Sequence, residues 1–183
     1  ADFDSTYGAI DLQYLPVSNT LIDRTLWLMP PEELNGSDTT DTLNNFMYYS
    51  IYTSYRLSHY NIPNNLLKAD SLKSVVKDYF DNYIPISMIF FEYSKIKENA
   101  HSDSLLYVSN EIIYDQPGRS ENPYERDTLF AGISSKGYLE NGNVNFILDS
   151  SKFMFSNLYN EIDSIKADFG DGSGYRMLNY DDT

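Results

Sequence analysis

The chain has 183 residues, of which 42% are hydrophobic and 15% aromatic, a composition typical of a folded protein rather than a disordered one. Its net charge of −14 disfavours general binding to nucleic acid or to anionic membrane surfaces. The absence of cysteine excludes disulfides, zinc–thiolate sites, iron–sulfur clusters and cysteine nucleophiles. No apolar run reaches the roughly 18–20 residues of a membrane span, so we expect no membrane insertion.

The N-terminal residues lack the basic region and the apolar core of an intact signal peptide, so the chain begins either at a mature end left after cleavage or at an arbitrary boundary. Residues 21–29, LIDRTLWLM, have strand character and contain the only tryptophan, Trp27. Pro30 and Pro31 end this run, because proline cannot donate to a β-ladder. Residues 32–40 read as a polar loop.

Two helices are predicted next. Asp41 or Thr42 can cap the first helix and Asp70 or Ser71 the second. The predicted buried face of the first helix consists of Leu43, Phe46, Met47, Ser50, Ile51, Ser54 and Tyr55. The predicted stripe of the second consists of Leu72, Val75, Val76, Tyr79, Phe80 and Tyr83. Both stripes indicate core packing rather than a cofactor site.

Beyond residue 85 the spacing of apolar residues no longer fits a helix and is typical of β-strands. The continuous apolar run 86–93, ISMIFFEY, is rich in β-branched and aromatic residues. Residues 105–108 and 111–114 can pair as a hairpin across Ser109 and Asn110, a turn without the favoured glycine. After a loop over residues 115–125, four further strands are predicted at residues 128–133, 144–148, 152–155 and 161–169.

These elements predict an α+β fold, in which a helical hairpin packs beside an antiparallel, sandwich-like β-rich half. We divide the chain into a mixed strand and helical region, residues 1–100, and a β-rich region, residues 101–183. The two regions could form one continuous domain.

The chemistry-bearing residues give no catalytic motif. His59 and His101 lack a second histidine at ligand spacing and read as surface residues. Glu92, inside the run 86–93, reads as a solvent-facing carboxylate, although an inward-facing one would need a partner such as Arg56, Arg119 or Arg126. Tyr48, Tyr49 and Tyr52 lie off the predicted helix face, so they could bind sugar if they were exposed together.

The segment 165–174, IKADFGDGSG, predicts a short strand that enters a glycine-containing turn. Asp168 and Asp171 can accept hydrogen bonds from exposed amides of that turn or offer oxygens to calcium. The spacing is not that of an EF-hand, which favours the turn, and no other cofactor is expected.

The residues Asp168 to Ser173, DFGDGS, resemble the core hexapeptide of PKD-type domains, which are immunoglobulin-like β-sandwich modules of extracellular multidomain proteins. In that family a tryptophan usually precedes the motif, where this chain has Ala167. Residues 84–97, 118–124 (GRSENPY) and 129–131 are similar to N-terminal regions of large secreted proteins of Bacteroidota, in which an FGDG segment also follows. The resemblance implies export and a cell-surface or extracellular location, and it assigns no catalytic residue.

Asp-Ser/Thr-aliphatic triplets occur five times, whereas composition alone would give about one. They are similar to the O-glycosylation sequon of exported Bacteroidota proteins, but Asp-Ser and Asp-Thr pairs also cap helices and begin strands. The candidate acceptors are Thr42, Ser71, Ser104, Thr128 and Ser164.

The sequence therefore predicts a non-catalytic interaction or scaffold module of an exported bacterial protein, with a protein or glycan at the cell surface as its partner. Two alternatives stay open. The chain could be a region of a secreted hydrolase that uses carboxylates, or a carbohydrate-binding module that uses exposed tyrosines.

Overall fold

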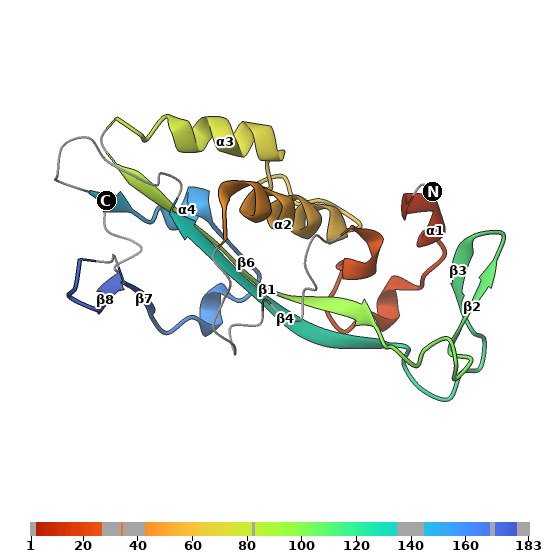
Figure 1. Ribbon diagram of the computed structural model, residues 1–183. Coiled ribbons are helices and arrows are strands. Elements are labelled where there is room, and N and C mark those ends of the chain that lie inside the picture. The colour runs from red at the N-terminus through yellow and green to blue at the C-terminus, as the bar shows by residue number, and fades with distance from the viewer. Residues whose placement is uncertain are drawn as a thin grey trace.

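The computed structural model describes residues 3–26, 34, 43–81, 83–134, 145–168 and 171–178. The fold class is α+β, as predicted: helices lie against a central sheet, and two further hairpins extend the molecule at its ends (Figure 1).

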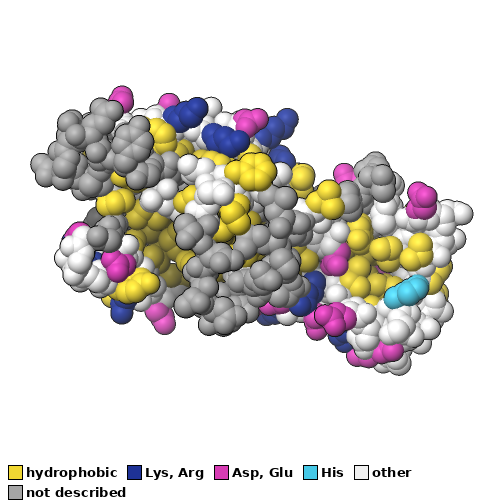
Figure 2. Space-filling view, in the orientation of Figure 1, with side chains coloured by type: hydrophobic (Ala, Val, Ile, Leu, Met, Phe, Trp, Pro, Cys, Tyr) yellow, Lys and Arg dark blue, Asp and Glu magenta, His cyan; other side chains and the backbone are white. Residues whose placement is uncertain are grey.

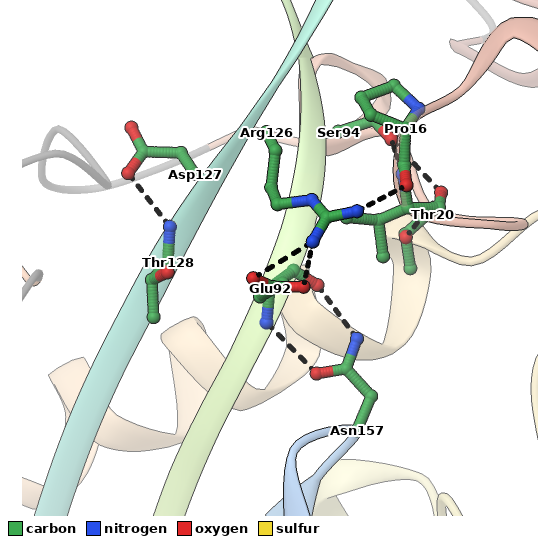
Figure 3. Close-up of polar contacts among 9 residues, drawn as sticks. Pro16, Thr20, Glu92, Ser94, Arg126, Asp127, Thr128 and Asn157 are labelled. Carbon is green, nitrogen blue, oxygen red and sulfur yellow. Dashed lines mark hydrogen bonds and ion pairs between the residues drawn. The ribbon is translucent and has the colours of Figure 1, made fainter. Parts of the chain in front are cut away.

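The main sheet is built around β1 (Ile84–Ile96). Residues 86–96 of β1 pair with antiparallel β4 (Tyr124–Ser134), and its other edge pairs with β5 (Phe146–Ile147) and β6 (Met154–Ser156), both parallel. Beyond β6 the side chain of Asn157 continues this edge, because Nδ2 donates to the Glu92 carbonyl and Oδ1 accepts from the Glu92 amide, each at 2.9 Å (Figure 3). Residue 100, where the sequence analysis divides the chain into two regions, lies between β1 and β4, and these two strands pair with each other.

Helices α2 (Asn45–Ser58) and α3 (Ala69–Lys77) lie on one side of the β1–β4 ribbon, and the hairpin of β7 (Ile165–Asp168) and β8 (Tyr175–Leu178) lies on the other (Figure 1). Because side chains alternate along a strand, one face of β1 packs on the helices and the other faces β7 and β8. The main core combines α2, α3, β1 and β4 through Tyr48, Ile51, Tyr52, Tyr55, Leu72, Val76, Ile89, Phe91, Tyr93, Leu129 and Ala131.

The other end of the molecule holds the hairpin of β2 (Leu106–Ser109) and β3 (Ile112–Asp115), close to α1 (Phe3–Thr6) (Figure 1). Short 3₁₀ turns occur at Leu12–Tyr14, Ile22–Arg24 and Tyr159–Glu161. The last helix, α4 (Ser150–Phe153), directly precedes β6.

The buried face of α2 differs from the predicted one. Tyr48 and Tyr52 are completely buried, whereas Phe46, predicted to be buried, is 72% exposed. The observed face repeats at the same helical spacing but is rotated around the helix. The Tyr52 hydroxyl donates to the carbonyl of Leu67 at 2.9 Å, which satisfies the polar tip of a buried ring.

The helix starts also differ from the prediction. Asn44 caps α2, its side chain accepting a hydrogen bond from the Met47 amide, and α3 begins after Lys68 rather than at Asp70 or Ser71. Asp41 and Thr42 lie outside the described residues. An asparagine is as good a cap as aspartate or threonine, so composition alone did not distinguish these positions.

The strand predictions are largely confirmed. The runs 86–93 and 128–133 lie within β1 and β4, which extend further at both ends, and the run 144–148 contains β5. Three segments differ. Residues 152–153 belong to α4, and Ile22–Arg24 forms a 3₁₀ turn where a strand was predicted. In the predicted strand 161–169, Glu161 belongs to a 3₁₀ turn and β7 begins only at Ile165. Several positions of the predicted N-terminal strand and loop lie outside the described residues: Trp27, Pro30, Pro31 and residues 32–40 apart from Leu34.

Candidate functional site

The candidate site lies at the end of the molecule that carries β2 and β3, where three segments meet. These segments are the N-terminal residues 10–15, the end of β3 and the loop 116–123. A second apolar core holds them together and consists of Ile10, Leu15, Leu21, Ala100, Leu105, Leu106 and Tyr124.

Asp115, the last residue of β3, joins these segments. Its Oδ2 accepts from the Asp11 amide at 2.8 Å, and its Oδ1 accepts from the Tyr124 hydroxyl at 3.2 Å and lies 2.9 Å from Nη1 of Arg119. The side chains of Asp115 and Arg119 are only 12% and 11% exposed. Burial raises the pKa of Tyr124, and the negative charge of Asp115 raises it further, so the phenol stays protonated and donates.

The loop after β3 begins with a tight turn over residues 116–119. Pro117 and Gly118 occupy its centre, and Gly118 has φ +70°, as a type II turn requires of its third residue. The turn places the Arg119 guanidinium 4.0 Å above the ring of Tyr14. Asn122 closes the loop on the same segment by donating to the Tyr14 carbonyl at 2.7 Å.

A polar cleft of about 480 Å³ lies between the N-terminal segment and this loop. Its lining includes the partly exposed ring of Tyr14 and the carboxylates of Asp11 and Glu121. Glu121 forms an ion pair of 2.8 Å with Lys97, and the Asp11 side chain accepts from the Gln13 amide at 3.2 Å. The cleft thus combines an aromatic surface with hydrogen-bonding groups that are held in place.

The β2–β3 hairpin carries a stacked aromatic pair, which we call the tyrosine pair: Tyr107 on β2 and Tyr114 directly opposite on β3. The ring centroids lie 5.1 Å apart with an interplanar angle of 14°, and Tyr107 is 38% exposed. Figure 2 shows apolar side chains on the surface at this end of the molecule. Tyr107 and Tyr114 share one face of the hairpin, whereas Leu106 and Ile113, which pack on the second core, belong to the other.

The sequence analysis misplaced the turn of this hairpin by one residue, which changes the strand register by two residues. The hairpin was predicted, but with Ser109 and Asn110 in the turn, whereas the turn residues are Asn110 and Glu111. In the predicted register Tyr107 would face Ile112. The local signal that could have placed the pair is asparagine, which tolerates the positive φ required at the first position of this turn.

The three tyrosines singled out in the first helix do not form an exposed sugar-binding surface. Tyr48 and Tyr52 are in the core, and Tyr49 is half-buried with its ring edge-to-face against Tyr48 at 5.6 Å. Among the described residues, the exposed tyrosines all lie outside α2; they are Tyr14, Tyr83, Tyr107, Tyr159 and Tyr175.

Asp171 is engaged within the turn between β7 and β8. Its Oδ1 accepts from the Ser173 amide at 3.0 Å, and its Oδ2 lies 2.6 Å from Nη2 of Arg176. The hydrogen bond from the Ser173 backbone and the charge of Arg176 lower the pKa of Asp171. Calcium binding at Asp168 and Asp171 stays a prediction. In the described part of the chain, no group of three or more Asp, Glu or His side chains is placed to hold a metal ion.

Glu92 and His59 have structural partners. The Glu92 carboxylate lies 3.2 Å from Nη1 of Arg126, whose Nη2 donates to the Pro16 carbonyl at 3.1 Å (Figure 3). His101 is exposed, as predicted. His59, predicted to be a surface residue, is half-buried, and its Nδ1 lies 2.9 Å from the Tyr55 carbonyl. Burial lowers the pKa of His59.

The described candidate acceptors differ in exposure. Ser71, Ser104 and Ser164 are exposed and Thr128 is half-buried in β4, while Thr42 lies outside the described residues. In each of these four triplets the aliphatic residue after the hydroxyl is buried, and these residues are Leu72, Leu105, Leu129 and Ile165.

None of the helices among the described residues is both long and apolar enough to cross a bilayer. Comparison of the chain with protein-family models, with curated proteins and with solved structures finds no match.

Proposed function

We propose that this chain is a non-catalytic interaction module of an exported, cell-surface or secreted bacterial protein, and that it binds its partner through the β2–β3 end. The observation that carries this proposal is the stacked, partly exposed tyrosine pair on a hairpin at the end of the molecule. Stacked tyrosines offer a wide amphipathic surface that loses little side-chain entropy on binding, which suits protein and glycan recognition.

The support beneath the pair favours a binding surface that is already formed in the free chain. Asp115 connects the end of β3 to the N-terminal segment and to the loop, so the hairpin is anchored at its base by ionic and hydrogen-bonded contacts. A surface that is rigid before binding loses less conformational entropy on association. The cleft at Tyr14 adds hydrogen-bonding groups at the same end of the molecule.

Export and glycosylation are parts of this proposal that depend on the resemblance to Bacteroidota surface proteins and to PKD-type segments. The exposure of Ser71, Ser104 and Ser164 supports their accessibility to a glycosyltransferase. Mass mapping of peptides from the native protein tests this part: hexose at these residues is the expected result, and unmodified peptides at all of them would contradict it.

The binding proposal is tested with the double variant Tyr107→Ala/Tyr114→Ala. Wild-type and variant chains are applied to a glycan array and to immobilised exported proteins of the native source. We expect a selective ligand for the wild type and a loss of at least about tenfold in affinity for the variant, because aromatic residues dominate binding energies. A glycan ligand would identify carbohydrate binding and a protein ligand would identify protein recognition.

Tyr83→Ala is the matched control, since Tyr83 is 43% exposed, directly precedes β1 and belongs to neither β2 nor β3. Circular dichroism of all variants checks that the fold is retained. The proposal fails if the wild type binds neither class of ligand, or if the double variant binds as tightly as the control.

A further inference from the structure

A second surface, distinct from the tyrosine pair, lies on the face of the main sheet that points away from α2 and α3. The β7–β8 hairpin covers this face only in part. Ile165 of β7 packs there against Met88, and both are buried. The neighbouring rings of Phe90 and Phe130 stay half-buried, with centroids 6.2 Å apart in an edge-to-face arrangement.

Two adjoining hollows follow from this incomplete cover, with volumes of about 340 Å³ and 380 Å³. They share Met88, Phe130, Ile165 and Lys166 as walls, so together they form one elongated cleft between the sheet and β7. Figure 2 shows apolar side chains recessed at the end of the molecule where β7 and β8 lie. The cleft is open to solvent along one side, unlike the enclosed sites that bury most of a small ligand.

Most of the charged side chains around the cleft are negative. Glu161, Asp163 and Asp168 contribute three carboxylates to its lining, and Lys166 contributes the one cation among the described lining residues. Glu161 and Asp163 are exposed, so their charges act on whatever approaches from solvent. The net charge of −14 on the whole chain adds a long-range attraction for cations.

We infer that this cleft binds an extended segment of a partner protein that combines apolar side chains with lysine or arginine. The apolar floor of Met88, Phe90 and Phe130 accepts the apolar side chains, and the carboxylates at the rim pair with the basic ones. An open, elongated groove suits a peptide chain that alternates these two kinds of residue. The inference does not depend on the tyrosine pair, so either surface can be functional without the other.

Three synthetic peptides of equal length test it by fluorescence anisotropy: one alternates leucine with lysine, one leucine with glutamate, and one serine with lysine. We expect the leucine–lysine peptide to bind at least about tenfold more tightly than either of the others at low salt, and to weaken as salt is added. Equal binding of the serine–lysine peptide would show that net charge alone attracts it, and preference for the glutamate peptide would show that Lys166 dominates. Either result overturns the inference.

Charge variants locate the site. The double variant Glu161→Gln/Asp163→Asn is expected to weaken the leucine–lysine peptide by about fivefold or more. The matched control Glu98→Gln/Asp103→Asn removes the same formal charge from exposed positions that follow β1, and we expect it to change affinity by less than about twofold. Equal weakening by both variants contradicts binding at the cleft.

Methyl NMR of the methionines supplies an independent readout, because Met88 lines the cleft whereas Met47 lies on α2. The Met88 methyl signal should move on titration with the leucine–lysine peptide while that of Met47 stays in place. A shift of Met47 without a shift of Met88 would place the peptide elsewhere and refute the inference.

Discussion

At the scale of single residues, Asp115 has the largest structural consequence at the candidate site. One carboxylate connects the N-terminal segment, the turn over residues 116–119 and the start of β4, through Asp11, Arg119 and Tyr124. Because the side chains of Asp115 and Arg119 are nearly buried, removing one charge leaves the other without compensation in a poorly solvated position.

We therefore expect Asp115→Asn to lower the free energy of unfolding by about 2–3 kcal/mol, since it leaves a nearly buried guanidinium without its carboxylate partner. Urea denaturation followed by tryptophan and tyrosine fluorescence measures the change. Asp103→Asn, an exposed carboxylate in the same half of the chain, should change stability by less than about 0.5 kcal/mol. Equal stability of Asp115→Asn and wild type would show that this carboxylate does not hold the site together.

At the scale of elements, the β2–β3 hairpin contains a local conflict. Asn110 and Glu111 both adopt positive φ, 51° and 65°, as the two-residue turn of a tight hairpin requires. Asparagine tolerates this region, whereas glutamate does so at a cost of about 1–2 kcal/mol. The tyrosine pair depends on this turn, because the turn sets the register that places Tyr107 opposite Tyr114.

Glu111→Gly is expected to raise the free energy of unfolding by about 0.5–1 kcal/mol, because glycine removes the steric cost but loses more backbone entropy on folding. Equilibrium urea unfolding measures the gain. Ser109→Gly, within β2, serves as the control and should lower stability instead. A destabilised Glu111→Gly variant would mean that the turn has another backbone conformation in solution.

The same element shows what the sequence could and could not predict. Runs of apolar residues identified both strands of the hairpin, but register depends on which residues accept positive φ. Moving the turn by one residue changes the cross-strand partner of every strand residue by two positions, so that Tyr107 would face Ile112 instead of Tyr114. On α2 the buried face was predicted wrongly because tyrosine occurs both in cores and on surfaces. The predicted face treated Tyr48 and Tyr52 as surface residues, yet a tyrosine ring can be buried when a single acceptor satisfies its hydroxyl, as Leu67 does for Tyr52.

At the scale of the whole molecule, the α+β class followed from the change in hydrophobic period, whereas the sheet pairing did not. The parallel pairing of β6 with β1 joins residues 154–156 to residues 88–90, and no local pattern specifies a partner so distant in the chain. The apolar cleft beneath the sheet was likewise hidden, because its walls come from β1, β4 and β7, which are distant in sequence.

The abundance of buried tyrosine also predicts how the whole fold responds to alkaline pH. Burial raises the pKa of eight tyrosines, and that of Tyr52 reaches about 12. They are Tyr7, Tyr48, Tyr49, Tyr52, Tyr55, Tyr60, Tyr124 and Tyr159. Above about pH 10 the unfolded chain releases phenolic protons that the folded chain retains. The unfolded state then binds fewer protons, so the free energy of unfolding falls as pH rises.

Lysines titrate in the same pH range as tyrosines, so a single-residue variant is needed to isolate the contribution of one phenol. Tyr48→Phe is suitable because Tyr48 is completely buried. Each phenol that ionises only in the unfolded state lowers stability by about 1.4 kcal/mol per pH unit above its unfolded pKa. Between about pH 10 and pH 11 we therefore expect Tyr48→Phe to lose about 1 kcal/mol less stability than wild type in urea titrations. Tyr107→Phe, at an exposed position on the hairpin, is the control. If the Tyr48→Phe and wild-type curves fall in parallel, the Tyr48 hydroxyl ionises in the folded chain as readily as in the unfolded one, and its burial within the core is contradicted.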